Sequence, residues 1–441
     1  MQTPWAILLC KFKDDAREPY TRQRFEELFT SSGSGKFNMV DYFRDMSHGV
    51  LDLSGSKVFG WFTLDQNSSE YTGSGPNPQG RTDLIMWARQ KAIDNNIDLS
   101  QFFSVVVCTN VPETDLFGGP DGVVCDDGRW DPKGEWEFDG MSSLSPSTLG
   151  QEMGHVYGLN HSRADGALED YMDQWDVMST VTALMTAHPF ITDRDQRGRL
   201  IFRIGPGINA ANMWGRGWLD LTRVWTAGAE EFGATVQLRP LHHRDLPGYL
   251  AACVGPYFLE FRVPELWDAG IRQAVVLVHE FSLGYSYIHT GKSGNQGLIA
   301  GDQFEWGAAS DPLGPQIRVE VVSIDAAART ATLRVHRQQD RRLEAGPAQI
   351  FGGVASDGGG WVIIGGKVHK IPPRSPVLHM LEDLVALQES ESISHGATRD
   401  LLRRDALEGV SARANAELAR MLSYRSPSPP RLEQKTDSDQ V

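Results

Sequence analysis

A glutamine, a glutamate and two histidines are spaced for metal chemistry in the segment LGQEMGHVYGLNHS, residues 149 to 162. If the first half of this segment is helical, Gln151 and His155 lie on one face, one turn apart, because an α-helix advances about 100° per residue. Glu152 then lies about 60° from His155 on the same helix. The spacing predicts that Gln151 and His155 bind one metal ion while Glu152 stays unbound beside it.

The rest of the segment completes this pattern. Gly158 is expected to end the helix, because glycine readily adopts the left-handed backbone that follows a helix. The chain then turns back and brings His161 to the metal as a third ligand. A catalytic zinc ion keeps three protein ligands and a water, whose pKa it lowers to near 7. Glu152 is then placed to take the proton of that water and pass it to a leaving amine, so the pattern predicts peptide hydrolysis.

The pattern Glu-x-x-His-x-x-Gly-x-x-His should arise by chance in roughly one chain of this composition in several hundred. The alternative is an ordinary core helix that happens to carry two histidines. A second motif, Trp-Asp-Val-Met-Ser at residues 175–179, lies downstream. Metzincin metalloproteases carry a methionine turn after the zinc-binding helix, and Met178 is expected in that place beneath the metal. Met178 alone would be interpreted as a core residue.

Together the two motifs resemble the gametolysin-type and immune-inhibitor-A-like metalloproteases. The resemblance covers Gln-Glu-x-x-His-x-x-Gly-x-x-His-Ser from Gln151 to Ser162, and Tyr-Met-Asp-Gln-Trp-Asp-Val-Met ending at Met178. Glutamine in place of the first histidine recurs in the gametolysin group. The resemblance implies a secreted, zinc-dependent metalloendopeptidase that cleaves protein or peptide substrates. It also implies an α/β (α+β) catalytic domain with a mixed sheet.

Gln151 leaves three interpretations open, because an amide oxygen is neutral and binds zinc less well than imidazole. The chain is a Gln-His-His zinc enzyme, a site with another metal or a further ligand, or a catalytically impaired pseudoprotease that binds a peptide or carbohydrate. Glu152 favours the enzyme, since a protein that only binds needs no base. Asp173 and Asp176 either orient a histidine ring or cap the turn, and capping is the favoured interpretation.

The composition limits the classes of partner. The net charge of −15 over 441 residues argues against nucleic acid, because phosphate binding needs a basic face. No apolar stretch reaches the roughly 20 residues that span a bilayer. The first ten residues show no signal peptide, so the compartment stays open between the cytoplasm and export by a non-classical route. The oligomeric state is open as well.

The first part of the chain alternates strand and helix patterns. Residues 110–147 are expected to form a long loop, whose acidic residues are either solvated or bind Ca²⁺. The four cysteines are expected to be small buried residues, although Cys108 and Cys125 would pair in an oxidising compartment. Helices are expected at 21–29, 37–46 and 81–95, and strands at 5–12, within 50–64 and at 102–107, the last in the centre of the sheet.

The character of the chain changes near residue 226. The expected domains are a catalytic domain at 1–225, an all-β sandwich-like domain at 226–338, a glycine-rich segment with a helix at 339–400, and a polar helix with a disordered tail at 401–441. Among the other histidines, His48 is expected in a turn and the pair His242 and His243 at the surface. His188 either lines the cleft or has a structural role, and the structural role is the favoured interpretation. Strands are expected at 235–238, 257–262, 274–281, 316–324 and 331–337.

Overall fold

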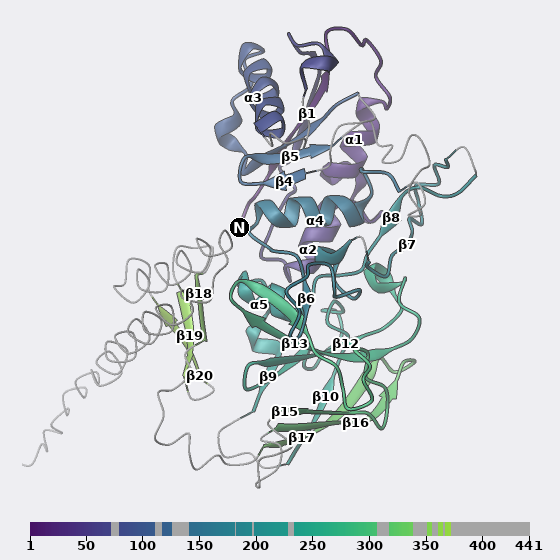
Figure 1. Ribbon diagram of the computed structural model, residues 1–441, viewed down its shortest axis with the longest axis vertical. Coiled ribbons are helices and arrows are strands. Elements are labelled where there is room, and N and C mark those ends of the chain that lie inside the picture. Colours follow the sequence, from purple (N-terminus) through teal and green to yellow (C-terminus); the bar gives the residue numbers. More distant parts are fainter. Residues whose placement is uncertain are drawn as a thin grey trace, which may run out of the picture. The chain divides into compact units, whose positions relative to one another are not determined.

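The computed structural model describes residues 1–71, 79–110, 117–125, 141–180, 182–195, 198–227, 233–306 and 317–337, together with three strands between 351 and 371. The chain divides into two compact units, residues 1–340 and 341–441. The expected boundary between residues 225 and 226 therefore lies inside the first unit. Across the ranges described, no helix is both long and apolar enough to cross a bilayer. The fold is mixed α/β (Figure 1).

A five-stranded mixed sheet forms one end of the first unit. Its order is β2-β1-β3-β5-β4, parallel except for β4, which runs antiparallel to β5 at the edge. The valine-rich strand β3 is buried at every position, which suits a strand covered on both faces, and it takes the central place that was expected. The strands are β1 (Trp5–Lys11), β2 (Lys57–Thr63), β3 (Ser104–Cys108), β4 (Phe117–Gly119) and β5 (Gly122–Cys125).

The expected loop at 110–147 is wrong in part, because β4 and β5 form a hairpin inside it. Two short runs, Phe-Gly-Gly and Gly-Val-Val-Cys, gave too little periodicity to predict these strands. Of the acidic residues considered for Ca²⁺, only Asp121 lies within the described residues. All four cysteines are buried, as expected, and the Sγ atoms of Cys108 and Cys125 lie 3.1 Å apart on neighbouring strands.

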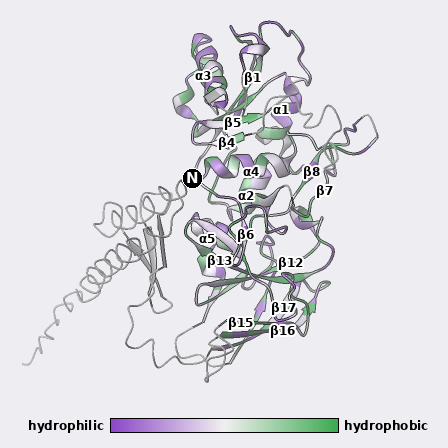
Figure 2. Cartoon of the chain, in the orientation of Figure 1, coloured by the Kyte–Doolittle hydropathy of each residue, from purple (hydrophilic) through white to green (hydrophobic). Residues whose placement is uncertain are grey.

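Three helices accompany this sheet, close to where they were expected: α1 (Arg22–Phe29), α2 (Met39–Met46) and α3 (Gln79–Asp94). Thr21 and Asn38 cap α1 and α2, each accepting a backbone N–H with its side-chain oxygen. Leu84 and Ala88 of α3 belong to a core with Ala6 and Leu8 of β1. Figure 2 shows both hydrophilic and hydrophobic residues along α3, as expected of a helix with one face on a sheet.

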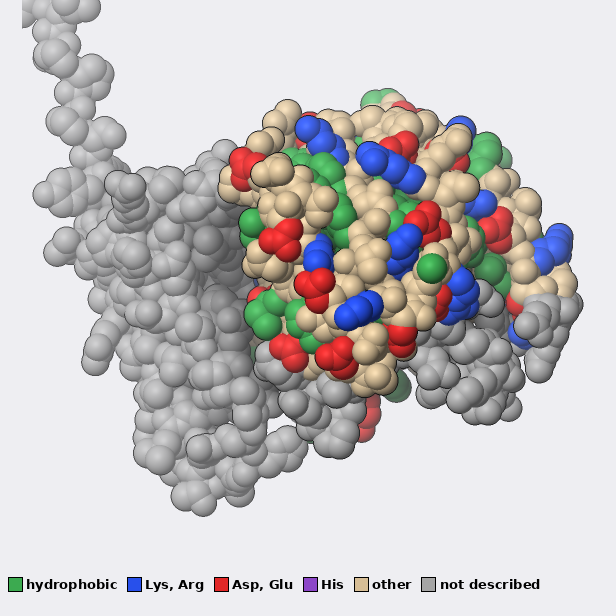
Figure 3. Space-filling model, turned by 90° about the horizontal axis from the view of Figure 1, so that it is seen from above, with side chains coloured by type: hydrophobic (Ala, Val, Ile, Leu, Met, Phe, Trp, Pro, Cys, Tyr) green, Lys and Arg blue, Asp and Glu red, His purple; other side chains and the backbone are tan. Residues whose placement is uncertain are grey.

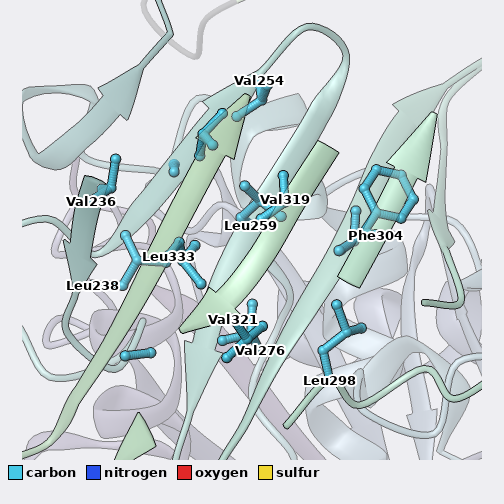
Figure 4. Packing of buried hydrophobic residues seen from close by; sticks show 14 of the residues in the cluster. Val236, Leu238, Val254, Leu259, Val276, Leu298, Phe304, Val319, Val321 and Leu333 are labelled. Carbon is cyan, nitrogen blue, oxygen red and sulfur yellow. The ribbon is translucent and has the colours of Figure 1, made fainter. Parts of the chain in front are cut away.

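Two further sheets share a second core. A six-stranded sheet has the order β6-β14-β13-β12-β11-β9, and a four-stranded sheet has the order β10-β17-β16-β15. Leu259 and Val276 of the first sheet join Val319 and Leu333 of the second in this core (Figure 4). The expected sandwich strands are therefore confirmed, within one or two residues at their ends. They are β10 (Ala234–Leu238), β12 (Tyr257–Arg262), β13 (Val275–Ser282), β16 (Ile317–Asp325) and β17 (Thr330–Arg337). The strands β11 (Ala251–Val254), β14 (Tyr285–Ile288) and β15 (Gln303–Trp306) were not predicted from the sequence.

The six-stranded sheet draws strands from both halves of the first unit. β6 (Arg163–Ala164) follows directly after His161 and pairs in parallel with β14, Arg163 opposite Tyr287. β9 (Val224–Thr226) pairs in parallel with β11 at the other edge. The helix α4 (Pro146–Val156) lies between the five-stranded and six-stranded sheets (Figure 1). The segment of interest is therefore anchored to both sheets.

The second unit contains a three-stranded antiparallel sheet, β18 (Phe351–Val354), β19 (Gly360–Ile364) and β20 (Lys367–Ile371). The apolar run from Trp361 to Ile364 within the glycine-rich segment forms most of β19. The helix expected after residue 375 and the tail expected at 401–441 lie outside the described residues.

Charged side chains are distributed differently at the surface and inside. Figure 3 shows basic and acidic side chains interspersed over one face of the molecule. Inside, the guanidinium of Arg262 is 1% exposed and donates to Glu260 Oε1 at 2.9 Å, Asp268 Oδ1 at 2.7 Å and the Ile208 carbonyl at 3.1 Å. Burial of three charges is tolerated because each one has charged or backbone partners.

We predict that Arg262→Met lowers the free energy of unfolding by about 3–5 kcal/mol, because it leaves two buried carboxylates without their cation. The control is Arg334→Met, which removes an exposed pair with Glu320 and should cost about 0–1 kcal/mol. Urea unfolding followed by circular dichroism measures both. Equal losses in the two variants would contradict the prediction.

Candidate metal centre

At two positions of α4 the neighbouring segments lie so close that only glycine fits. The helix begins with Pro146, whose missing N–H costs nothing in the first turn, and it is buried through Gly154. A Cβ on Gly150 would lie 2.9 Å from the ring of Tyr42, and one on Gly154 would lie 2.8 Å from Met178 Sδ. The two glycines therefore let α2 and the segment around Met178 approach the helix.

The end of α4 orients the first histidine. Gly158 has φ +85°, and its N–H donates to the His155 carbonyl at 2.8 Å while the Leu159 N–H donates to the Gly154 carbonyl at 2.9 Å. These two bonds form a Schellman cap, as the position of the glycine predicted. The carbonyl of Leu159, fixed by this cap, lies 2.8 Å from His155 Nδ1. The turn that ends the helix thus also holds the imidazole ring.

The second histidine is oriented by side chains. His161 Nδ1 lies 3.1 Å from Asp170 Oδ2, and Arg163 Nε donates to the other oxygen of that carboxylate at 2.8 Å. The Arg163 guanidinium in turn stacks 3.6 Å from the ring centroid of Tyr285 on β14. His161 is therefore held through a carboxylate, a guanidinium and an aromatic ring that belongs to the six-stranded sheet.

The two imidazoles meet at their Nε2 atoms, which lie 3.0 Å apart. A carbonyl and a carboxylate can only accept, so both Nδ1 atoms carry the proton and both Nε2 atoms present a lone pair. Burial lowers the pKa of His155 to about 4, helped by nearby His161, and burial also lowers the pKa of His161. Both rings are thus neutral near pH 7, and their Nε2 lone pairs face each other, an arrangement that a cation bound between them would stabilise. Zinc with bonds of about 2.0–2.1 Å holds its donor atoms roughly 3.3 Å apart, so the pair fits.

A tyrosine that sequence reasoning missed lies against this pair. The hydroxyl of Tyr171 is 2.9 Å from His161 Nε2, and the two ring centroids are 4.1 Å apart. Asp170, which orients His161, was missed as well. Both residues precede the methionine motif by less than ten positions, and a polar or aromatic residue in a loop carries no spacing signal of its own.

Gln151 lies on the helix as predicted, but both atoms of its amide make hydrogen bonds within the protein. Its Oε1 accepts the Thr180 N–H at 2.9 Å, and its Nε2 donates to Glu152 Oε1 at 3.3 Å. Among the residues that the structure describes, no three His, Cys, Asp or Glu side chains gather in a group that could hold a metal ion. Within the described ranges, an amide and a phenol are further oxygen donors near the histidine pair.

Glu152 follows Gln151 on α4, and its side chain is buried. Burial raises the pKa of the Glu152 carboxyl to about 7, against hydrogen bonds from the Gln151 side chain and the Gly118 backbone that lower it. The Glu152 charge also raises the pKa of Tyr171, after burial, to about 12. The carboxyl is therefore within electrostatic reach of the tyrosine that contacts His161, and it is poised to hold or release a proton near neutral pH.

Met178, Asp173 and Asp176 lie in the segment that packs against α4. Met178 lies on the short helix η4 (Val177–Ser179), fully buried against Gly154. Asp176 caps η4 by accepting the Met178 N–H at 2.7 Å, and Asp173 accepts the Trp175 N–H at 3.0 Å, so the predicted capping is confirmed. Asp173 Oδ2 also lies 2.9 Å from Nε2 of His279 on β13, a histidine that the sequence did not single out.

The other histidines take structural places. His48 adopts a left-handed backbone in its turn, and His188 Nδ1 accepts the Phe190 and Ile191 N–H groups. The expectation that His242 and His243 are exposed is wrong, because His242 is half-buried, and His243 is 6% exposed and faces Glu265 at 3.6 Å. A compact unit that continues past residue 226 covers this position, which a domain boundary would have left at the surface.

Comparison with protein-family models finds no match for the chain, and comparison with curated proteins finds none either.

We predict that Asp170→Asn weakens zinc binding by roughly 10–100-fold, because the amide has no negative charge and only one oxygen, which cannot accept from both Arg163 and the Nδ1–H of His161. Competition of the protein with a chromophoric chelator measures the affinity. Asp165→Asn is the control, since this exposed carboxylate pairs with His289 instead. Unchanged zinc affinity in Asp170→Asn would contradict the role given to this carboxylate.

Proposed function

We propose that the protein is a zinc-dependent endopeptidase of the metzincin type. The observation that carries the proposal is the pair of neutral imidazoles whose Nε2 atoms face each other at 3.0 Å, together with a buried carboxyl three residues before His155 on the same helix. A divalent cation satisfies both lone pairs, and a carboxyl with a pKa near 7 suits a group that takes and returns a proton. The methionine packed against Gly154 and the glycine cap after His155 support the metzincin type.

The residues around the cation have different roles in the proposed reaction. When bound, zinc lowers the pKa of a water and polarises the carbonyl of the scissile peptide. Glu152 takes the proton of the attacking water and later gives it to the leaving amine. The Gln151 amide and the Gly118 N–H hold the Glu152 carboxylate in place for both transfers. His155 and His161 keep their orientation through Leu159 and Asp170, so the geometry at the cation does not depend on the substrate.

A second function is a binding protein that holds a peptide or carbohydrate without cleaving it. The observation that favours it is Gln151, which stands where a third histidine ligand would be and whose oxygen already accepts from Thr180. Loss of a ligand weakens metal binding and with it any activity. The two functions differ in whether a bound peptide is hydrolysed, and that difference can be measured.

We predict that the wild-type protein hydrolyses casein or a quenched fluorescent peptide library, loses this activity to a chelator and regains it with zinc. Glu152→Gln should lower the rate by about 10²–10⁴-fold while zinc binding persists, because it removes the base and keeps its shape. Glu169→Gln, at an exposed position, serves as the control. Zinc-free wild-type protein that still cleaves peptides, or cleavage that survives Glu152→Gln, would contradict the proposal, and peptide binding without cleavage by wild type would favour the second function.

A further inference from the structure

We propose that the phenolic oxygen of Tyr171 is the third protein ligand of the metal, in place of the Gln151 amide. The inference rests on the proposed function to the extent that a divalent cation binds His155 and His161. It goes further because it replaces one member of the ligand set that the sequence predicted and gives that member another role.

Two potential donor atoms lie within 3.0 Å of His161 Nε2. The Nε2 atoms of His155 and His161 are 3.0 Å apart, and the Tyr171 hydroxyl lies 2.9 Å from His161 Nε2. These separations are slightly shorter than the roughly 3.3 Å between two ligands of a tetrahedral zinc ion. A phenolate oxygen is an anionic donor, whereas an amide oxygen is neutral. Two histidines and a tyrosine therefore leave one position open for a water.

The backbone holds Tyr171 in this place. Its φ is +66°, in the left-handed region that bulky residues rarely adopt unless the surroundings impose it. The Thr182 hydroxyl donates to the Tyr171 carbonyl, and the Met172 N–H donates to the Ser162 carbonyl at 3.2 Å. The preceding residue, Asp170, is fixed to His161. The phenol is therefore presented by a segment tied on both sides to the neighbourhood of His161.

Gln151 is the positioning residue in this arrangement. Its Oε1 accepts from the Thr180 backbone and its Nε2 donates to Glu152, so the amide joins the loop after Met178 to the carboxylate. A histidine at this position could not make both bonds with the same geometry, because its two nitrogens point away from each other across a ring. In this arrangement Gln151 positions Glu152, and Tyr171 binds the cation.

Copper(II) in the purified full-length protein gives a direct readout. A tyrosine phenolate bound to copper(II) produces a visible charge-transfer absorption that histidine, glutamine and water ligands do not. We expect this absorption in the wild type and in Gln151→Leu, and we expect Tyr171→Phe to abolish it. Zinc affinity, measured by chelator competition, should fall about tenfold or more in Tyr171→Phe and much less in Gln151→Leu.

Tyr249→Phe is the matched control, because this exposed tyrosine is far along the chain from the site and should leave the spectrum unchanged. Circular dichroism checks that each variant is folded, and the wild-type spectrum tests the inference even if a variant is not. Copper bound to wild type without the phenolate absorption overturns the tyrosine ligand while leaving the proposed zinc site standing. Loss of zinc affinity in Gln151→Leu but not in Tyr171→Phe also overturns it, and wild type that binds no divalent cation overturns both proposals.

Discussion

Two imidazole lone pairs held 3.0 Å apart in a buried place are unfavourable by themselves, and the surrounding structure is arranged to keep them there. The carbonyl of Leu159 in the helix cap accepts the Nδ1–H of His155, and the carboxylate of Asp170 accepts the Nδ1–H of His161. Neither ring can relieve the contact by changing tautomer without breaking its outer hydrogen bond. The fold thus maintains the repulsion between the two Nε2 lone pairs, and a cation bound between them would remove it.

The six-stranded sheet takes part in this arrangement although most of its strands lie more than sixty residues after the motif. Tyr285 stacks on the arginine that holds Asp170, and Asn160 donates to the Gly284 carbonyl at 3.1 Å. His279 contacts Asp173 below the methionine segment. These contacts are tertiary, and they hold the loop between the two motifs against the six-stranded sheet. Orientation of the second histidine is therefore a property of both sheets together.

Most helices and strands could be predicted from the sequence, because hydrophobic periodicity and capping residues depend only on neighbouring positions in the chain. Alternation or continuous apolar runs marked the sandwich strands and β3, and the Gly158 cap followed from one residue type at one place. The hairpin of β4 and β5 was missed because its strands are too short to show a period. In the site, helical spacing placed Gln151, Glu152 and His155 on one helix, but no spacing rule says which atom an amide oxygen will meet. Asp170 and Tyr171 reach His161 through a loop, whose path depends on contacts with distant strands.

The pairing of β6 with β14 bears on how such a chain can be rearranged in evolution or by engineering. Two residues after the second histidine, the backbone already belongs to a sheet completed by residues 224–288. A recombination that exchanges everything after residue 225 would break the ladder at both ends, at β6 and at β9, and release the arginine next to the motif. The β-rich half therefore cannot be swapped like an independent accessory module, and ancestral fusions or designed chimaeras are confined to crossover points beyond residue 337.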